Sequence, residues 1–424
     1  RKLHICEFYQ SVFIKHYLMR TTILLFLIMA SLQLMGEGYQ VNLQGQKNTA
    51  MGHTGTGFIA GPSIIHFNPG GLGFYEKKMA FNAGVSLIFS NNLYQAPNSY
   101  YEAETENPIG TPFYFYGAMR INDKMAVGLG VNTPYGNRLK WEDDWAGRYL
   151  SRDIALQAIT LQPTFSYKIT DWMSVGAGLL VAFNSVELSK NIPVTGTDGD
   201  GLVTLEGNKT TFGVNAGLMF KISDELTAGI SYRSQMKAKV TDGTATIDVP
   251  DALSSMFPEE TGFEATLPFP ANYNFGVAYQ PSDKFMITAD INYVQWEVYD
   301  SLNFDFEENT ENFQDSYNPR EYTNSFIYRI GAAYKWKEEV TFRAGAYFDA
   351  TPIDDNYFTP ETPGTDKIGI TGGASIRPFE NFEIDVSLLY IHGMKRESGY
   401  EPDNFEGTFY TNAVIPGVGF TYSF

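Results

Sequence analysis

The stretch KMAFNAGVSLIFS, residues 78–90, alternates large apolar side chains with small or polar ones. Successive side chains of a β-strand point to opposite faces, so every second residue shares a face. One face of this stretch carries only apolar residues: Met79, Phe81, Ala83, Val85, Leu87 and Phe89. The other face carries mostly small or polar ones: Asn82, Gly84, Ser86 and Ser90. The pattern predicts a strand with one apolar face.

The same alternation recurs to the end of the chain and predicts 14 strands. Their expected ranges are 79–90, 111–121, 124–134, 153–168, 172–188, 209–222, 225–240, 267–280, 283–298, 321–336, 338–350, 366–378, 380–393 and 410–424. The composition fits, because aromatics make up 15% of the 424 residues and glycine occurs 40 times. Such a mixture favours β structure with tight turns over a helical bundle.

The connections between these strands alternate between short and long. Short turns of two or three residues alternate with seven long polar loops, at 91–110, 135–152, 189–208, 241–265, 299–320, 351–365 and 394–409. An even number of strands with long loops on one side is typical of an outer-membrane barrel. We therefore predict an all-β, 14-stranded antiparallel transmembrane β-barrel over residues 78–424. A soluble β-sandwich or propeller, the competing fold, lacks the one-sided long loops.

The charged residues within the strands provide an internal test of this prediction. They all fall on the face opposite the apolar series: Arg120, Arg233, Asp290, Arg329, Arg343, Glu383 and Asp385. A lipid-facing arginine near the membrane midplane would cost about 2–4 kcal/mol. Phe420, Tyr422 and Phe424 share one face of the last strand. Such an aromatic end resembles the signal by which the barrel-assembly machinery recognises outer-membrane proteins, which makes that machinery an expected partner.

Charge and cysteine content exclude several function classes. The net charge is −18, whereas nucleic-acid binding needs a basic surface. Cys6 is the only cysteine, which excludes a disulfide framework and a cysteine metal site, and we expect no metal and no cofactor. Beyond residue 38 the only histidines are His53, His66 and His392, without a recognisable Ser/His/Asp spacing. We therefore expect that the chain is not an enzyme.

The first 38 residues look like a leader. Met19-Arg20 precedes the apolar stretch TTILLFLIMASLQLM (21–35), which has the length of a secretory core. We expect residues 1–38 to be an upstream extension plus a signal peptide that starts at Met19, with Tyr39 as the mature start. An N-terminal anchor helix is the alternative, although the stretch is shorter than the ~20 residues of a spanning helix.

Residues 39–77 lack the strand alternation and hold small groups of apolar residues. Within IIHFNPGGLGF (64–74), Asn68-Pro69-Gly70 signals a tight turn, and five large apolar residues surround it. A segment of this kind beside a barrel is best housed in the lumen, so we predict a plug over 39–77. A turn before the first strand, with incidental apolar neighbours, is the alternative.

Several stretches of the sequence resemble a known family. GYQVNLQGQ (38–46) and FNPGGLGF (67–74) look like the hatch of FadL-type long-chain fatty acid transporters, and LPFPANYNFGVAYQPSDKFMITADINYVQW (267–296) is also similar. The family motif in the hatch is Asn-Pro-Ala, and Gly70 here departs from it. The resemblance covers nearly all of the chain after the leader. It implies a 14-stranded barrel with an N-terminal hatch in the outer membrane of a Gram-negative bacterium.

The resemblance also implies a function, the passive uptake of hydrophobic small molecules such as long-chain fatty acids. Outer loops 189–208 and 241–265 would capture the ligand, the second with a short helix at 250–257. A bound carboxylate would need a cation, and the candidate lumen residues are Arg233, Arg329, Arg343, Asp349 and Lys367. In the alternative, these charges pair with one another and hold the plug.

Release in this family is lateral, beside a kinked third strand. Gly128, Gly130 and Pro134 are the candidates for such an opening, with Pro134 expected to end the third strand and Pro163 to interrupt the fourth. Uptake of neutral aromatic hydrocarbons by the same fold, or a non-specific porin, are the alternative functions. We further expect a monomer surrounded by outer-membrane lipid and lipopolysaccharide.

Overall fold

The computed structural model describes residues 38–194 and 199–424. The predicted leader, apart from Gly38, lies outside these described residues. Within the two described ranges, no helix is both long enough and apolar enough to cross a membrane.

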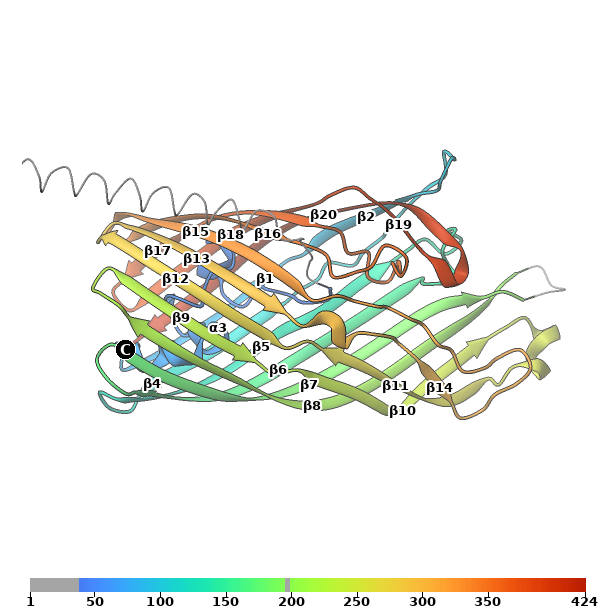
Figure 1. Ribbon diagram of the computed structural model, residues 1–424, viewed down its shortest axis with the longest axis horizontal. Helices are drawn as coiled ribbons and strands as arrows, with labels where there is room; N and C mark the ends of the chain where they lie inside the picture. Colours follow the sequence, from blue (N-terminus) through green and yellow to red (C-terminus); the bar gives the residue numbers. More distant parts are fainter. Residues whose placement is uncertain (1–37, 195–198) are drawn as a thin grey trace, which may run out of the picture. The chain divides into compact units, whose positions relative to one another are not determined.

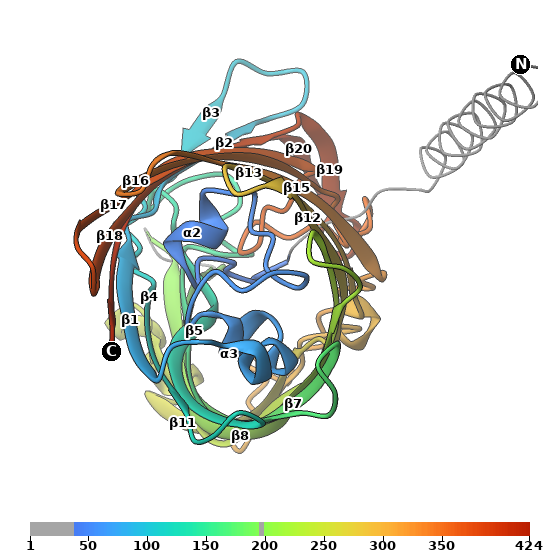
Figure 2. The same ribbon diagram turned by 90° about the vertical axis from the view of Figure 1, so that its left-hand side faces the viewer.

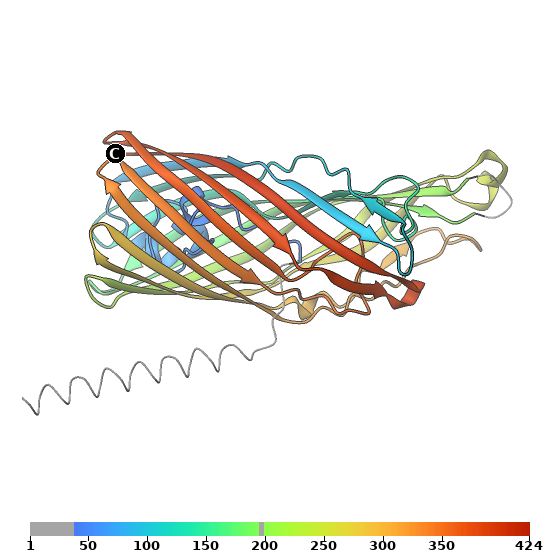
Figure 3. The ribbon, with the colours of Figure 1, turned by 90° about the horizontal axis from the view of Figure 1, so that it is seen from above.

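The structure is a closed antiparallel barrel with 14 wall strands, which confirms the predicted fold class (Figure 1). Seven long connections lie at one end, and six short turns and the C-terminus lie at the other. Pairing of the first strand with the last closes the ring, from Ala80↔Ser423 to Ser86↔Gly417. Figure 3 shows the strong tilt of the strands across the wall.

Eleven wall strands are continuous, or nearly so, and three are broken in two. The broken ones are β1 (Met79–Ser86) with β2 (Phe89–Gln95), β9 (Leu226–Arg233) with β10 (Met236–Asp248), and β11 (Glu260–Phe269) with β12 (Asn272–Ser282). The others are β4 (Phe113–Arg120), β5 (Met125–Lys140), β6 (Asp153–Lys168), β7 (Met173–Ile192), β8 (Gly201–Lys221), β13 (Phe285–Val294), β15 (Ser325–Lys337), β16 (Val340–Asp349), β17 (Lys367–Phe379), β18 (Phe382–Gly393) and β20 (Phe405–Ser423). β3 (Glu102–Glu104), β14 (Phe304–Phe306) and β19 (Arg396–Tyr400) belong to the long connections.

The predicted distribution of charge is confirmed for five of its seven residues, whereas Arg343 is half-buried and Arg120 is exposed. Arg233, Asp290, Arg329, Glu383 and Asp385 are all buried inside the barrel. Large apolar residues are exposed on the outer face instead, among them Phe81, Phe115, Phe165, Phe212, Phe275, Phe342 and Phe420. The wall is therefore apolar towards lipid and polar towards the lumen, as membrane insertion requires.

The structure corrects the predicted ends of several strands. β7 continues to Ile192 and β8 begins at Gly201, so the predicted capture loop 189–208 is largely strand. In the same way, β10 continues to Asp248 and β11 begins at Glu260, so the predicted capture loop 241–265 is also largely strand. The predicted helix at 250–257 exists as a short 3-10 helix, η2 (Asp251–Met256).

The expectation that Pro134 ends the third strand is wrong, since β5 continues to Lys140. Its pairing with β6 passes from Asn132↔Thr160 to Tyr135↔Ala158. Thr133 and Pro134 therefore oppose a single residue, which is a β-bulge that accommodates a proline within a strand. Pro163 leaves β6 continuous, but the β6–β7 ladder skips it, because proline lacks the backbone N–H.

The N-terminal segment, residues 39–77, lies within the ring of strands (Figure 2). It forms α2 (Gln46–Thr49), α3 (Ile64–Phe67) and the 3-10 helix η1 (Pro69–Phe74). Inward-facing glycines let its backbone approach the wall. At Gly176, for example, a Cβ atom would lie 2.2 Å from the Pro69 carbonyl oxygen. The segment is thus packed against the wall by backbone as well as by side chains.

Candidate ligand path and polar chamber

The Asn68 side chain holds the turn of the N-terminal segment in place. Its Oδ1 accepts a hydrogen bond from the Gly70 N–H at 3.0 Å. Its Nδ2 donates to the carbonyl oxygens of Thr56 and Leu218, each at 2.9 Å. Asn68 is fully buried, so one side chain joins two parts of the segment to β8. The Gly70 carbonyl in turn accepts from Ser166 and Ser174 of the wall.

The apolar residues around this turn pack against the wall on the side of β4 and β5. Ile64, Ile65 and Leu72 form a buried cluster with Tyr114, Tyr116, Ala118 and Ala126. Gly128 and Gly130 lie under Ile65, and a Cβ atom at Gly128 would lie 2.4 Å from Ile65 Cδ1. These two glycines, predicted as part of a lateral opening, are therefore the seat of the N-terminal segment.

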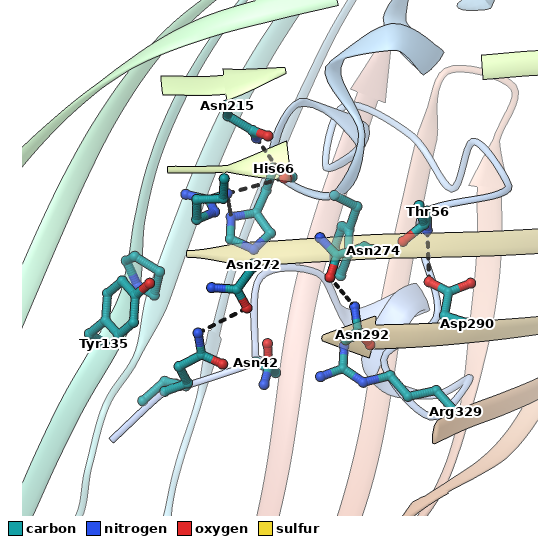
Figure 4. Close-up of a pocket in the computed structure, with 15 residues that line it drawn as sticks. Asn42, Thr56, His66, Tyr135, Asn215, Asn272, Asn274, Asp290, Asn292 and Arg329 are labelled. Atoms are coloured by element: carbon teal, nitrogen blue, oxygen red, sulfur yellow. Dashed lines mark hydrogen bonds between the residues drawn. The ribbon is translucent and has the colours of Figure 1, made fainter. Parts of the chain in front are cut away.

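A second region of contact is strongly polar, and we call it the polar chamber (Figure 4). It is a cavity of about 50 Å³ between the segment and strands β5, β8, β9, β12, β13 and β15. Its polar lining consists of Gln40, Asn42, Thr56, His66, Asn215, Arg233, Asn272, Asn274, Asp290, Asn292 and Arg329. A space of this size holds a carboxylate group or a few water molecules.

Arg233 offers the chamber a hydrogen-bond donor without a partner, whereas Asp290 Oδ1 and Asn292 Oδ1 are acceptors without a partner among the described residues. One terminal nitrogen donates to the His66 carbonyl at 3.1 Å and lies 2.9 Å from His66 Nδ1. Burial, together with the charges of Arg233 and Arg329, holds the pKa of His66 well below its ordinary value, so the imidazole is neutral and accepts. The other terminal nitrogen of Arg233 has no hydrogen-bond partner within residues 38–194 and 199–424.

The remaining chamber charges hold the N-terminal segment. Arg329 donates to the His53 carbonyl at 3.2 Å, and Asp290 accepts from the N–H groups of Gly55 and Thr56 at 2.9 Å each. With two guanidinium groups, one carboxylate and a neutral His66, the chamber carries a net charge of +1. It is a positive region in a protein whose net charge is −18.

The other predicted ligand residues lie elsewhere. Arg343 donates to Ser375 and lies near Asp385 and Glu383, in a network that also contains the ion pair between Lys47 and Glu383. It therefore belongs to an anchor of the N-terminal segment. Asp349 is fully buried and is the cross-strand neighbour of Lys367. Lys367 lines a different cavity, described next.

Three cavities lie in sequence from the long-loop end towards the chamber. The outer groove, about 480 Å³, is lined by Leu150, Lys190, Ile192, Phe304, Phe306, Phe313 and Phe405 among others. The narrow cavity, about 50 Å³, is lined mainly by apolar residues of β6, β7, β8, β10 and β11. The wide cavity, about 570 Å³, contains Tyr39, Leu139, Lys367, Leu389 and Ile415 in its lining.

Shared lining residues connect these cavities. Leu205 and Phe304 border both the outer groove and the narrow cavity. Tyr39, Leu156 and Thr362 border both the narrow and the wide cavity. The wide cavity and the polar chamber share Gln40, Asn42 and Tyr135. A mostly apolar path therefore leads from the outer loops to a polar, cationic end.

The wide cavity also passes through the barrel wall beside β5. The β4–β5 ladder stops at Tyr114↔Asn132, and the N-terminal segment takes over the exposed edge of β5. The Val41 N–H donates to the Pro134 carbonyl at 2.9 Å, and Gly136 N–H to the Tyr39 carbonyl at 3.1 Å. The cavity lining includes the buried Tyr135 as well as Arg138 and Gln157, which are exposed on the outer face.

Comparison with known proteins identifies the family. The model of the outer membrane protein transport protein family (OMPP1/FadL/TodX) matches residues 27–424. The chain belongs to this family. Among curated FadL/TodX relatives, the outer membrane protein P1 of Haemophilus influenzae is 23% identical over 85% of this chain and 84% of its own length. The long-chain fatty acid transport protein of Salmonella typhi is 22% identical over 93% of this chain and 96% of its own length.

Solved structures share the fold of the FadL/TodX chain described here. A Pseudomonas aeruginosa FadL homologue has a TM-score of 0.82 at 19% identity and covers 92% of this chain and 100% of its own. The toluene transporter TodX of Pseudomonas putida has a TM-score of 0.71 at 17% identity, with coverage of 92% and 99%. The predicted family and outer-membrane location are confirmed, and the chain is an outer-membrane transporter of hydrophobic compounds.

Sequence reasoning missed part of the site. The asparagines of the polar chamber, Asn272, Asn274 and Asn292, carried a usable signal, since they fall on the lumen face together with Asp290. The aromatic cluster of Tyr39, Tyr135, Phe269, Trp296 and Tyr299 carried none, because its members come from four separate parts of the chain.

Proposed function

We propose that this FadL/TodX family member takes up long-chain fatty acids, with the tail in the connected cavities and the carboxylate beside Arg233. The polar chamber is the observation that supports this choice. Burying a carboxylate is costly unless a cation and hydrogen-bond donors receive it. The chamber offers a guanidinium nitrogen without a partner, several amide side chains and a net positive charge, next to an apolar path.

Release is lateral in this proposal. The wide cavity reaches the outer face of the wall beside the bulge at Thr133-Pro134, where residues 39–41 of the N-terminal segment pair with the edge of β5. Displacement of residues 39–41 from that edge would open a route from the cavity into lipid. Residues 39–77 thus act as a hatch, and Gly128 and Gly130 act as its seat rather than as the opening itself.

Neutral hydrocarbons are the second candidate ligands. The narrow cavity favours them, since its lining is almost entirely apolar and its one charged residue, Glu361, is an acid. A neutral ligand would use the path without the chamber, and Arg233 would then serve only to anchor His66. A non-specific porin agrees less well, because the segment of residues 39–77 occupies the lumen.

The remaining parts of the proposal concern the surroundings of the protein. The exposed apolar outer face supports contact with outer-membrane lipid and lipopolysaccharide. The aromatic residues at the end of β20 support recognition by the barrel-assembly machinery. We propose a monomer, because the closed ring leaves no wall strand with an unpaired edge for a second copy.

Ligand identity is the test. The protein, purified in detergent, is extracted and the bound small molecules are identified by mass spectrometry, with an unrelated outer-membrane barrel as control. Palmitate and hexadecanol are then compared as competitors, because they share an apolar chain and differ in charge. Preference for palmitate supports the carboxylate site. Equal binding of both would remove it and leave hydrophobic uptake intact.

A further inference from the structure

The connection between β16 and β17, residues 350–366, folds inward rather than out into solvent, and we call it the inward loop. The sequence predicts an ordinary polar outer loop at 351–365, and the burial of its side chains shows that this prediction is wrong. Ile353, Phe358, Thr359, Glu361 and Thr362 are all at most 8% exposed. A polar loop with such burial must be covered by other parts of the protein.

The partners of the inward loop lie across the lumen. Trp141 Nε1 donates to the Pro360 carbonyl at 3.0 Å, and Asn137 Nδ2 donates to the Glu361 carbonyl at 2.6 Å. Both donors belong to β5 or follow it directly. Four wall strands, counting β1 and β2 as one, separate β17 from β5 around the ring. The loop therefore bridges the outer mouth of the barrel.

A buried ion pair ties the tip of the inward loop to a second outer connection. Arg320 donates to Glu361 Oε1 at 2.5 Å, and the two side chains are 6% and 4% exposed. The Arg320 guanidinium lies 5.7 Å from the ring centre of Tyr400, and Tyr322 shares a 2.9 Å hydrogen bond with Thr362. Arg320 itself belongs to the connection between β14 and β15.

The loop tip also forms a wall of the ligand path. Glu361 and Thr362 line the narrow cavity, and Thr362, Pro363 and Gly364 line the wide cavity. The narrow cavity, at about 50 Å³, connects spaces of about 480 and 570 Å³. The constriction on the path is therefore lined in part by residues of a loop rather than by barrel strands alone.

We propose that the inward loop is an outer gate and that the Arg320–Glu361 pair is its latch. Movement of residues 359–364 away from the lumen widens the constriction and joins the outer groove to the wide cavity. The identity of the transported molecule depends on the function proposed above, whereas the existence of the gate does not. The fold then has two barriers in series, the N-terminal segment on the short-turn side and the inward loop on the outer side.

An ion pair suits a latch. Two charges withdrawn from water are held together only while their geometry is kept, and separation lets both regain hydration. In this proposal the loop therefore has a closed position with the pair buried and an open position with both charges hydrated.

The gate can be tested by thiol labelling, which needs no ligand. Thr359 is the reporter, because it is 3% exposed and its hydroxyl has no hydrogen-bond partner among the described residues. Thr359→Cys is made in a Cys6→Ser background, and its reaction with a bulky hydrophilic maleimide is timed on folded protein. Glu361→Gln keeps the side-chain shape and one acceptor oxygen but removes the counter-charge of the buried Arg320, so labelling should accelerate roughly tenfold or more, in proportion to the open population.

Controls separate the latch from general loosening. Glu264→Gln breaks an exposed ion pair, in which the Lys239 and Glu264 side chains are 62% and 48% exposed. This variant should leave the rate of labelling unchanged. Barrel folding is checked by heat-dependent migration on gels. If Glu361→Gln does not fold, Glu361→Asp, which keeps the charge on a shorter side chain, should give a smaller acceleration. Equal labelling rates in the parent and in the folded latch variant would overturn the gate, whatever the transport result.

Discussion

The Thr56 carbonyl oxygen lies so close to Gly229 that a Cβ atom at position 229 would be 1.9 Å from it. Gly229 belongs to β9 and Thr56 to the N-terminal segment. A side chain at position 229 would therefore push the backbone of the segment away from the wall. Gly229→Ala should therefore weaken the docking of the segment by about 1–3 kcal/mol, the usual cost of overpacking. The expected result is a larger ion conductance in planar bilayers.

Gly372→Ala is the matched control for this substitution. The nearest atom to a Cβ at Gly372 is the Arg343 carbonyl oxygen at 3.8 Å, an ordinary contact. The conductance of the Gly372→Ala variant should equal that of the parent protein. An unchanged conductance in Gly229→Ala as well would mean that the segment does not restrict the lumen.

Asn68→Ala should loosen the same segment by a different route. The substitution leaves the Thr56 and Leu218 carbonyls and the Gly70 N–H without their partner, and each buried group left unpaired costs about 1–3 kcal/mol. Hydrogen exchange followed by mass spectrometry should show faster exchange over residues 52–74, with the strands unaffected. Asn68→Asp keeps the acceptor for Gly70 but turns a carboxylate oxygen towards the Thr56 and Leu218 carbonyls, so its effect should be at least as large.

Arg233→Gln should lower palmitate affinity and leave hexadecanol affinity unchanged. A hydrogen bond to a charged group contributes about 1.5–3 kcal/mol, which corresponds to roughly a ten- to hundredfold change in the dissociation constant. Arg343→Gln is the control, because Arg343 lies in the ionic network around Glu383 and borders none of the four cavities. If both variants lose palmitate equally, the arginines act through the stability of the lumen and not through the carboxylate.

The sequence was sufficient to predict the barrel because lipid imposes a simple rule on every strand. Alternate residues must be apolar, and a charge such as Arg233 or Asp290 must fall on the other face. The same rule placed Arg233, Arg329 and Arg343 in the lumen, and two of these three, Arg233 and Arg329, line the chamber. The rule did not reveal that Arg233 has a terminal nitrogen without a partner among the described residues. Which arginine nitrogen lacks a partner depends on the position of His66 and on how the N-terminal segment packs against the wall.

The burial of the inward loop could not be predicted from the sequence. Its proline-, threonine- and aspartate-rich sequence has the composition of an exposed loop. Its burial comes from Trp141, Arg320 and Phe409, which are distant in the sequence and follow no period. Similarly, Pro134 appeared to end a strand, whereas a bulge opposite Ile159 carries β5 past it. Long-range packing decided both outcomes.

A disulfide between positions 40 and 135 should block lateral release. Gln40 and Tyr135 are antiparallel neighbours, and the hydrogen bonds on either side of them make this a non-hydrogen-bonded pair, whose short Cα separation suits a disulfide. Oxidised Gln40→Cys/Tyr135→Cys protein should fail to deliver palmitate into proteoliposome lipid, and reduction should restore delivery. Full delivery in the oxidised state would exclude an opening beside β5.

Acid should loosen the N-terminal segment through His53. Burial, with a contribution from Arg329, lowers the pKa of His53 to about 3, against about 6.5 for an exposed histidine. The undocked state therefore binds a proton first, so docking is stable above pH 6.5 and weakens as the pH falls towards 3. Between pH 7.5 and pH 5.0 the loss from His53 alone should be about 2 kcal/mol, and His66, whose pKa is also lowered by burial, adds to the total.

Hydrogen exchange over residues 52–74 at the two pH values, corrected for intrinsic rates, measures this loss. His53→Asn is the control, because its backbone φ of 61° is one that asparagine accepts, and the variant cannot titrate in this range. The pH dependence should be smaller in the variant than in the parent. An identical dependence in both would assign the acid effect to another group, since His53 would then bind protons equally in the docked and undocked states.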